Sequence, residues 1–315
     1  MRLLGGWCLL LLLWPMPALG RDIFVDNTTG DDRSLGRQPR QTGDGTGPLA
    51  TIAAALRLAA SGDAIVLAKT PRPYRESVSL VGSCRSGTGQ QRFAIRGNGA
   101  VLDGSAPVPP GAWQNYRGPV FRFRPSQLGC QQLLLDDRPA TQVFVAPTAG
   151  GPPPLQPRQW CLLDGQIYFG VDPTKLPGDY HLSYARAQTG ITLYQVDRVA
   201  IADLVVQGFR LDGINLHNSA RNVSIVGVTC RGNGHSGVSV GGASLVDIDS
   251  SLLSDNGQAQ LLTLPHSETH LRHSRLLSHT APGWVDQGGR VYLDGNRVQG
   301  GLDEFHPTPN PEKKP

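Results

Sequence analysis

Lysine is nearly absent from this chain, and charged residues of either sign are few. The only lysines are Lys69, Lys175, Lys313 and Lys314, and charged residues make up 17% of the 315 positions. The basic residues are scattered, whereas a nucleic-acid-binding protein gathers them on one face among aromatic side chains. The composition therefore argues against a nucleic-acid partner. It also leaves residues 185–307 without a lysine that could act as a catalytic base.

Long apolar runs are missing beyond residue 20. A membrane-spanning helix needs about 20 predominantly apolar residues, so no membrane span is expected. Residues 1–20 instead have the pattern of a signal peptide: Arg2 is the basic start, Leu9 to Trp14 form a short apolar core, and Ala18-Leu19-Gly20 supplies small residues for cleavage. We therefore expect a protein that is secreted, or that is delivered to the periplasm or cell envelope.

The cysteines do not form a metal or redox motif. No CxxC spacing occurs, which argues against a zinc or thioredoxin-like site. Outside the signal peptide the cysteines are Cys84, Cys130, Cys161 and Cys230, and in an oxidising compartment they could form two disulfides in any of three pairings. Cys230 falls at an inward position of its expected strand, which favours a small buried side chain there.

A repeat of 22 to 24 residues organises the C-terminal part of the chain. Apolar residues alternate after each first anchor, as in Ile214 and Leu216, and this alternation predicts strands. Three short strands separated by turns fill one unit, and no intervening segment is long and apolar enough for a helix. One unit cannot bury its inward face alone, so successive units must stack. The two sets of anchors are Gly190, Gly213, Gly237, Gln260 and Gly283, and Ile201, Ile225, Ile248, Leu271 and Leu293.

These units resemble the coils of right-handed parallel β-helix proteins of the pectate-lyase-like superfamily. The rival architecture at this period is the leucine-rich repeat, but its Leu-x-x-Leu-x-Leu-x-x-Asn signature is missing. Residues 21–105 resemble the N-terminal cap and first coils of the same superfamily. The predicted fold is therefore all-β: a right-handed parallel β-helix solenoid with an N-terminal helical cap and a small inserted antiparallel β-domain.

The cap pattern consists of a strand, an Ala/Leu-rich helix, a second strand and a tyrosine. An amphipathic helix can cover the apolar core and the strand edges that an open solenoid end exposes. Two acidic residues of this pattern, Asp63 and Glu76, are therefore expected to be structural. The expected elements are a strand at 23–26, a helix from about Ile52 to Ser61-Gly62-Asp63, a strand at 64–68 and Tyr74-Arg75-Glu76.

Residues 106–184 lose the repeat and gather prolines, and their alternating segments predict a small antiparallel β-insert. The expected organisation is a signal peptide at 1–20, the cap and first coils at 21–105, the insert at 106–184, coils at 185–307 and a flexible tail at 308–315. Aromatic residues of the insert could stack on sugar rings, although the favoured alternative is that they form its core. They are Trp113, Tyr116, Trp160, Tyr168 and Tyr180.

A first set of candidate catalytic residues occupies outward positions of the second strands. Equivalent positions in parallel coils stack about 4.8 Å apart, so the alignment places Asp247 beside His270 and predicts a ladder of Asp249, Arg272 and Asp294. Such a set could act as acid, base and charge stabiliser on a uronic sugar or a glycosidic bond. The favoured alternative is an exposed ion-pair ladder without a catalytic role.

A second set lies at the turns around the first strands: Asp212, His217, Asn218 and His235. The segment from Gly232 to Gly237 resembles the histidine-bearing segment of polygalacturonases, and Asp212-Gly213-Ile214 resembles the end of their Asn-Thr-Asp-Gly motif. The coil that should carry their paired aspartates is absent, because Gly213 and Gly237 are one step apart, and no later Arg-x-Lys exists. A polygalacturonase is therefore disfavoured, and the alternative for His235 is that it caps a turn.

A third cluster combines His266, Glu268, His270 and His273. In strand-and-turn geometry these side chains need not face one another, so a metal site is only a minor alternative here. Lyases of this fold that use calcium place several carboxylates on one face beside a basic residue. Asp247, Asp249 and Arg272 could imitate that arrangement, and calcium is therefore the one cofactor that the resemblance suggests.

The resemblance implies a partner of the polysaccharide class. The net charge of +4 and the pI of about 8.9 favour an acidic polysaccharide over a neutral one. The leading hypothesis is a secreted enzyme that binds and cleaves polysaccharide, as a lyase or a glycoside hydrolase. The alternative is a non-catalytic repeat protein of the cell envelope or matrix that binds glycan or protein.

Overall fold

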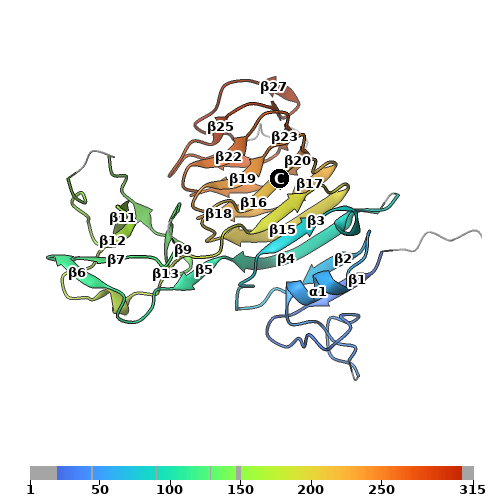
Figure 1. The fold of residues 1–315 in the computed structure, drawn as a ribbon, viewed down its shortest axis with the longest axis horizontal. Coiled ribbons are helices and arrows are strands. Elements are labelled where there is room, and N and C mark those ends of the chain that lie inside the picture. Colours follow the sequence, from blue (N-terminus) through green and yellow to red (C-terminus); the bar gives the residue numbers. More distant parts are fainter. Residues whose placement is uncertain (1–19, 44, 90, 128, 147–149, 307–315) are drawn as a thin grey trace, which may run out of the picture.

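The computed structural model describes residues 20–43, 45–89, 91–127, 129–146 and 150–306, and the chain is mainly β (Figure 1). The expected signal peptide, apart from Gly20, and the expected tail lie outside the described residues. Two large sheets of mostly parallel strands stack through the body of the molecule, and a smaller antiparallel region projects from their side. In the described part of the chain no helix is long and apolar enough to cross a membrane.

The first large sheet has 12 strands, and the second has six. The last pair of the first sheet is antiparallel, and the other pairs in both sheets are parallel. The first sheet contains β1 (Asp22–Val25), β2 (Ala64–Leu67), β4 (Phe93–Asp103), β15 (Val199–Gln207), β17 (Val223–Val226), β18 (Thr229–Arg231), β20 (Leu245–Asp249), β21 (Leu252–Ser254), β23 (Glu268–Arg272), β24 (Arg275–Leu277), β26 (Arg290–Leu293) and β27 (Asn296–Val298). The second contains β3 (Val78–Val81), β14 (Ile191–Tyr194), β16 (Ile214–His217), β19 (Ser236–Val240), β22 (Ala259–Thr263) and β25 (Trp284–Asp286).

The apolar anchors predicted from the repeat are direct neighbours in the first sheet. Ile201 pairs with Ile225, Ile225 with Ile248, Ile248 with Leu271, and Leu271 with Leu293. All five side chains are buried in one continuous apolar core. Each step of the repeat therefore adds strands to both sheets and one layer to the core, and this stacking fixes which residues become neighbours on the surface.

Two of the glycine anchors, Gly213 and Gly237, have a different physical cause, which is a buried ladder of amides. A Cβ at Gly213 would lie 2.7 Å from Asn233 Nδ2, and a Cβ at Gly237 would lie 2.8 Å from Asn256 Nδ2, so neither position has room for a side chain. Gln260 interrupts the glycine series, but its Oε1 accepts hydrogen bonds from the backbone N–H and the Nδ2 of Asn256 at 3.2 and 2.8 Å. The glutamine therefore supplies the next rung of the ladder itself.

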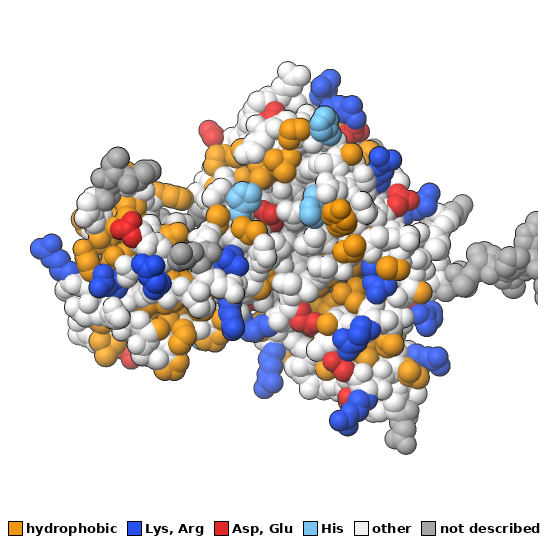
Figure 2. Space-filling model, viewed as in Figure 1, with side chains coloured by type: hydrophobic (Ala, Val, Ile, Leu, Met, Phe, Trp, Pro, Cys, Tyr) orange, Lys and Arg blue, Asp and Glu red, His pale blue; other side chains and the backbone are white. Residues whose placement is uncertain are grey.

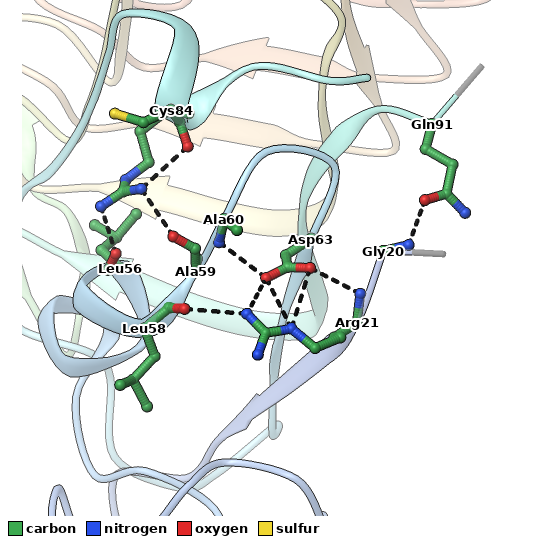
Figure 3. A network of polar contacts seen from close by, with 10 residues as sticks. Gly20, Arg21, Leu56, Leu58, Ala59, Ala60, Asp63, Cys84 and Gln91 are labelled. Carbon is green, nitrogen blue, oxygen red and sulfur yellow. Dashed lines mark hydrogen bonds and ion pairs between the residues drawn. The ribbon is translucent and has the colours of Figure 1, made fainter. Parts of the chain in front are cut away.

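The N-terminal helix α1 (Ile52–Leu58) ends earlier than the sequence suggested. Ala59 is already extended, and the Asp63 carboxylate accepts a hydrogen bond from Ala60 N at 2.9 Å. Asp63 also forms an ion pair with Arg21 at 2.7 Å (Figure 3). Glu76 accepts hydrogen bonds from the first two N–H groups of the helix, both at 2.9 Å. Both acidic residues thus fix the ends of the helix, which confirms the expected structural role.

The projecting region consists of two sheets, antiparallel except for the pair β10–β11, with their own apolar core. Trp160 and Tyr168 are buried in this region, Trp113 and Tyr180 pack against its core, and Tyr116 is 42% exposed. Most of its aromatic residues are therefore core residues, as the favoured alternative had it. The five-stranded sheet contains β6 (Gln114–Arg117), β7 (Val120–Phe123), β10 (Thr141–Gln142), β11 (Gln159–Leu163) and β12 (Gln166–Gly170), and the four-stranded sheet contains β5 (Ser105–Pro107), β8 (Leu133–Leu135), β9 (Arg138–Pro139) and β13 (Leu182–Ala185).

This region is tied to the stacked strands by a row of polar residues. Asp103, Gln207 and Arg231 are register neighbours at the ends of β4, β15 and β18. Gln207 donates to Asp103 Oδ2 at 3.1 Å and to the carbonyl of Asp137 at 3.2 Å, and Arg231 Nε donates to Gln207 Oε1 at 2.9 Å. Because Asp137 belongs to the turn before β9, these bonds hold the two parts together.

The four described cysteines are free thiols, so the possible disulfides are not formed in this structure. Cys230 is fully buried, as its inward position predicted, and burial raises the pKa of its thiol. Cys161 is also buried, and burial raises the pKa of its thiol to about 11. These two side chains act as small apolar groups of the core.

Candidate functional site

The stacking brings Asp212 and His235 together beside the second large sheet. Asp212 lies just before β16, and His235 lies just before β19, one repeat step later. Asp212 Oδ1 accepts hydrogen bonds from His235 Nδ1 and from Ser236 Oγ, each at 2.7 Å, and Oδ2 accepts one from Asn215 Nδ2 at 2.6 Å. The carboxylate side chain is 5% exposed and the imidazole is 30% exposed. A buried carboxylate therefore orients a histidine that solvent can reach.

The pKa shifts of the two groups both favour the ion pair. Burial alone would raise the pKa of Asp212, but the hydrogen bonds from His235, Ser236 and Asn215 outweigh it and lower the pKa below its ordinary value. The hydrogen bond to Asp212 raises the pKa of His235, and partial burial of the ring opposes this only in part. Because a carboxylate can only accept, Nδ1 carries the proton of the neutral imidazole, and its Nε2 keeps a free lone pair.

Replacing Asp212 with asparagine tests this coupling. The neutral amide cannot stabilise an imidazolium, so the pKa of His235 should fall below its value in the wild-type chain. NMR titration of the histidine ring signals measures the change, with Asp255→Asn, which removes the carboxylate partner of His279, as a matched control. A His235 pKa that stays the same in Asp212→Asn would contradict the coupling.

The surroundings of the pair come from three parts of the chain. A Cβ at Gly234 would lie 2.1 Å from the carbonyl oxygen of Cys130 and 2.5 Å from that of Arg210, so the turn before His235 packs directly on both backbones. Gln258 donates through its backbone N–H to the carbonyl of His235 at 2.8 Å and through Nε2 to Cys130 Sγ at 3.3 Å. The histidine therefore sits where the segment around Cys130, which leads back from β7 to β8, meets the stacked strands.

Two other residues of the second predicted set lie apart from the pair. His217 is the last residue of β16, and its ring contacts Tyr194 edge-on with centroids 5.2 Å apart. Asn218 follows in a left-handed conformation with φ of 51°. Within the described residues neither side chain hydrogen-bonds to Asp212 or His235. The structure thus assembles half of the second set.

The columns of the first predicted set are confirmed by the strand register. Asp247 pairs with His270 and Asp249 pairs with Arg272 across β20 and β23, and His270 pairs with Tyr292 on β26. The rings of His270 and Tyr292 stack with centroids 4.5 Å apart. Outward side chains of these strands therefore form one polar face, as the alignment predicted.

The ion pairs on this face differ from the predicted ladder. Arg272 forms its salt bridge diagonally with Asp247 at 2.8 Å, whereas Asp249 Oδ1 accepts from His273 Nδ1 at 3.0 Å. Asp294 lies beyond the end of β26 with φ of 46°, and its carboxylate accepts a hydrogen bond from the backbone of His273 at 3.2 Å. Asp249 and Arg272 are register neighbours as predicted, but Arg272 extends diagonally to Asp247, and Asp294 lies beyond the last residue of β26.

Glu268, which was predicted as part of the third cluster, also belongs to this face. Glu268 accepts from His270 Nε2 at 3.0 Å and from Arg290 Nε at 2.7 Å, and these two contacts lower its pKa. Burial would raise the pKa of Asp249, but its hydrogen bonds from His273 and Ser250 outweigh this and lower it. The carboxylates are therefore ionised and compensated by basic neighbours at neutral pH. This arrangement suits an ion-pair ladder better than a general acid.

We expect the exposed ion pairs of this face to contribute little to stability. Arg272→Gln should change the free energy of unfolding by less than about 1 kcal/mol, because the Arg272 and Asp247 side chains are 48% and 37% exposed. Urea denaturation followed by circular dichroism measures this change. A loss several times larger would show that the ion pair supports the fold.

The third cluster does not assemble into a metal site. His270 contacts Glu268, but His273 turns to Asp249, and His266 lies in a turn with φ of 66°. Among the described residues no group of three or more His, Cys, Asp or Glu side chains is placed to hold a metal ion. No calcium-binding arrangement is therefore found in the described part of the chain.

A cleft of about 570 Å³ is lined by three arginines and was not predicted from the sequence. Arg186 and Arg210 are 24 residues apart, which is one step of the repeat, so the alignment could have placed them together. Arg75 comes from the cap pattern and could not be aligned with them. The lining residues used below are Arg75, Asp103, Arg186 and Arg210.

Comparison with known proteins identifies a class of fold but no sequence family. No family model and no curated protein matches this chain. A solved structure described as a glycoside hydrolase matches with a TM-score of 0.56 and 11% identity, over 80% of this chain and 73% of the other. At this identity the likeness concerns the fold alone. The chain thus has a mainly β fold similar to that of a solved glycoside hydrolase.

Two further solved structures match more distantly. A complex of XylC with xylose matches with a TM-score of 0.41 and 12% identity, over 86% of this chain and 69% of the other. The GH136 lacto-N-biosidase from Eubacterium ramulus matches with a TM-score of 0.40 and 12% identity, over 81% of this chain and 41% of the other. Both scores are below 0.5, and nothing below rests on them.

Proposed function

We propose that this chain is an exported carbohydrate-active enzyme, built as a right-handed parallel β-helix with an inserted domain, that binds and cleaves polysaccharide. In this proposal residues 1–20 direct export, residues 21–105 and 185–307 form the cap and coils, and residues 106–184 form the insert. The stacked parallel strands and the fold-level likeness to a glycoside hydrolase support the architecture. The observation that carries the activity is the Asp212–His235 pair.

The pair has the geometry of a positioned proton-transfer group. Asp212 holds Nδ1 of His235 at 2.7 Å, which fixes the ring orientation and leaves Nε2 free to accept a proton from a sugar or from an attacking water. Ser236 and Asn215 in turn hold the carboxylate. The role of Asp212 is therefore to position His235 and to stabilise the imidazolium that forms when Nε2 takes up the proton.

The type of cleavage follows from the products. The purified mature chain is incubated with a panel of acidic and neutral polysaccharides, with and without calcium, while absorbance of unsaturated uronates and new reducing ends are followed. Unsaturated products would establish a lyase, and new reducing ends alone would establish a hydrolase. A folded chain that yields no product from any polysaccharide would contradict the enzymatic proposal.

A second function, glycan or protein binding without turnover, is favoured by the polar face of β20, β23 and β26, which we call the ladder face. The ion pairs of Asp247, Asp249 and Glu268 are fully matched, and they form an open polar surface rather than a reaction site. If this function is correct, changes on that face should lower affinity gradually. The wild-type chain should then show no catalytic activity with any polysaccharide.

A further inference from the structure

The three-arginine cleft opens where the projecting region meets the stacked strands. Its walls include the end of β4, β5 and the segments that follow β13 and β15. Figure 2 shows Lys and Arg side chains gathered near this junction. The cleft contains one carboxylate, Asp103, against the guanidinium groups of Arg75, Arg186 and Arg210. Its lining therefore carries an excess of positive charge.

The single carboxylate of the lining already has hydrogen-bond and ion-pair partners in the wall of the cleft. Asp103 is fully buried, and its Oδ1 accepts from the backbone of Ser105 at 2.7 Å and lies 3.8 Å from Arg75 Nη1. Its Oδ2 accepts from Gln207 at 3.1 Å. Arg75 also donates to Ser105 Oγ at 3.3 Å. Asp103 thus offsets part of the charge of Arg75, and no other carboxylate is among the described residues that line the cleft.

Arg186 has the donors that remain available. It is exposed, and its guanidinium forms no hydrogen bond or ion pair with the described residues, whereas its backbone carbonyl accepts from Arg210 Nε at 3.0 Å. A guanidinium presents its N–H groups as a planar fork, which matches the paired oxygens of a carboxylate or a sulfate. The cleft is therefore chemically suited to a small oxyanion on a larger molecule.

We propose that this cleft binds the carboxylate or sulfate group of an acidic polysaccharide, with Arg186 as its principal contact. This inference rests on the proposed function and names its substrate class. Arg210 lines the cleft and also contacts the surroundings of the histidine. Its carbonyl packs against Gly234, in the turn before His235. Its side chain approaches Gly129, where a Cβ would lie 3.2 Å from Arg210 Nη1. An anionic residue held in the cleft therefore places the neighbouring part of a glycan chain beside the turn that carries His235.

The test measures binding apart from turnover. Calorimetry with the full mature chain carrying His235→Gln compares oligosaccharides of equal length that bear carboxylates, sulfates or no charge. Arg186→Gln is then added in the same background, and Arg57→Gln, an exposed arginine of α1, is the matched control. The expected result is binding of a charged oligosaccharide but not the neutral one, with about tenfold weaker affinity after Arg186→Gln, as the loss of one charge-assisted contact implies. Arg57→Gln should leave the affinity unchanged.

Each outcome decides the proposal. Preference for the carboxylated or for the sulfated oligosaccharide identifies the anion, and either supports the cleft as its site. Equal affinity for the neutral oligosaccharide, or an affinity that Arg186→Gln leaves unchanged, would overturn it. Because no turnover is required, anion binding that depends on Arg186, found while the wild-type chain cleaves no polysaccharide, would refute the proposed activity alone.

Discussion

Replacing His235 with glutamine is expected to lower turnover of a cleaved polysaccharide by about 1000-fold while the fold is retained. Glutamine keeps a polar side chain but cannot take up a proton at neutral pH. Its neighbours, Asp212 and the backbones of Cys130 and Arg210, stay in place. Initial rates of product formation, with circular dichroism as the check on folding, measure the effect.

The matched control for this variant is His270→Gln. His270 is also hydrogen-bonded to a carboxylate, Glu268, and its exposed fraction is similar at 31% against 30% for His235. It belongs to the ladder face, however, and its change should alter turnover by less than about threefold. If His270→Gln abolishes turnover and His235→Gln does not, the active site lies on the ladder face instead.

Replacing Asn256 with alanine is expected to destabilise the protein by about 4 kcal/mol, because several buried groups lose their partners at once. Asn256 Oδ1 accepts from the backbone and the side chain of Asn233 at 3.0 and 2.9 Å. Its Nδ2 donates to the carbonyl of Cys230 at 3.1 Å and to Gln260 Oε1 at 2.8 Å. Alanine can replace none of these contacts, and the buried amide ladder has no access to water.

Urea denaturation measures this loss, and a lower midpoint at an unchanged slope would assign it to stability. The melting temperature should fall by about 10 °C. Asn296→Ala is the matched control, because Asn296 is exposed on β27, and its change should cost less than about 0.5 kcal/mol. Equal effects of the two variants would show that the buried amide ladder does not stabilise the stack.

The repeat allowed much of the fold to be predicted, because parallel stacking turns sequence spacing into spatial contact. Ile225 and Ile248 are neighbours since they are one step apart, and the same logic brought Asp212 to His235. The glycine anchors could be located, but their cause could not. Only the structure shows that Asn233 and Asn256 occupy the space that a side chain at Gly213 or Gly237 would need.

Side-chain pairing, and the contacts between the projecting region and the stacked strands, could not be predicted from the sequence. Register placed Asp249 beside Arg272, yet a flexible arginine reaches Asp247 instead, and spacing does not encode that choice. The cleft joins Arg75 to Arg186 through the close approach of segments that follow no common period. Such contacts depend on how the projecting region packs against the stacked strands, and the repeat carries no information about that packing.

The most direct test of the account compares the pH dependence of kcat/KM with the pKa of His235. The hydrogen bond to Asp212 raises this pKa above its ordinary value. A histidine that acts as a base is active only when deprotonated, so activity should rise with pH through a midpoint equal to the His235 pKa from NMR. In Asp212→Asn both values should move to lower pH together. A kinetic midpoint that stays in place while the NMR pKa of His235 falls would contradict the claim that His235 carries out the proton transfer.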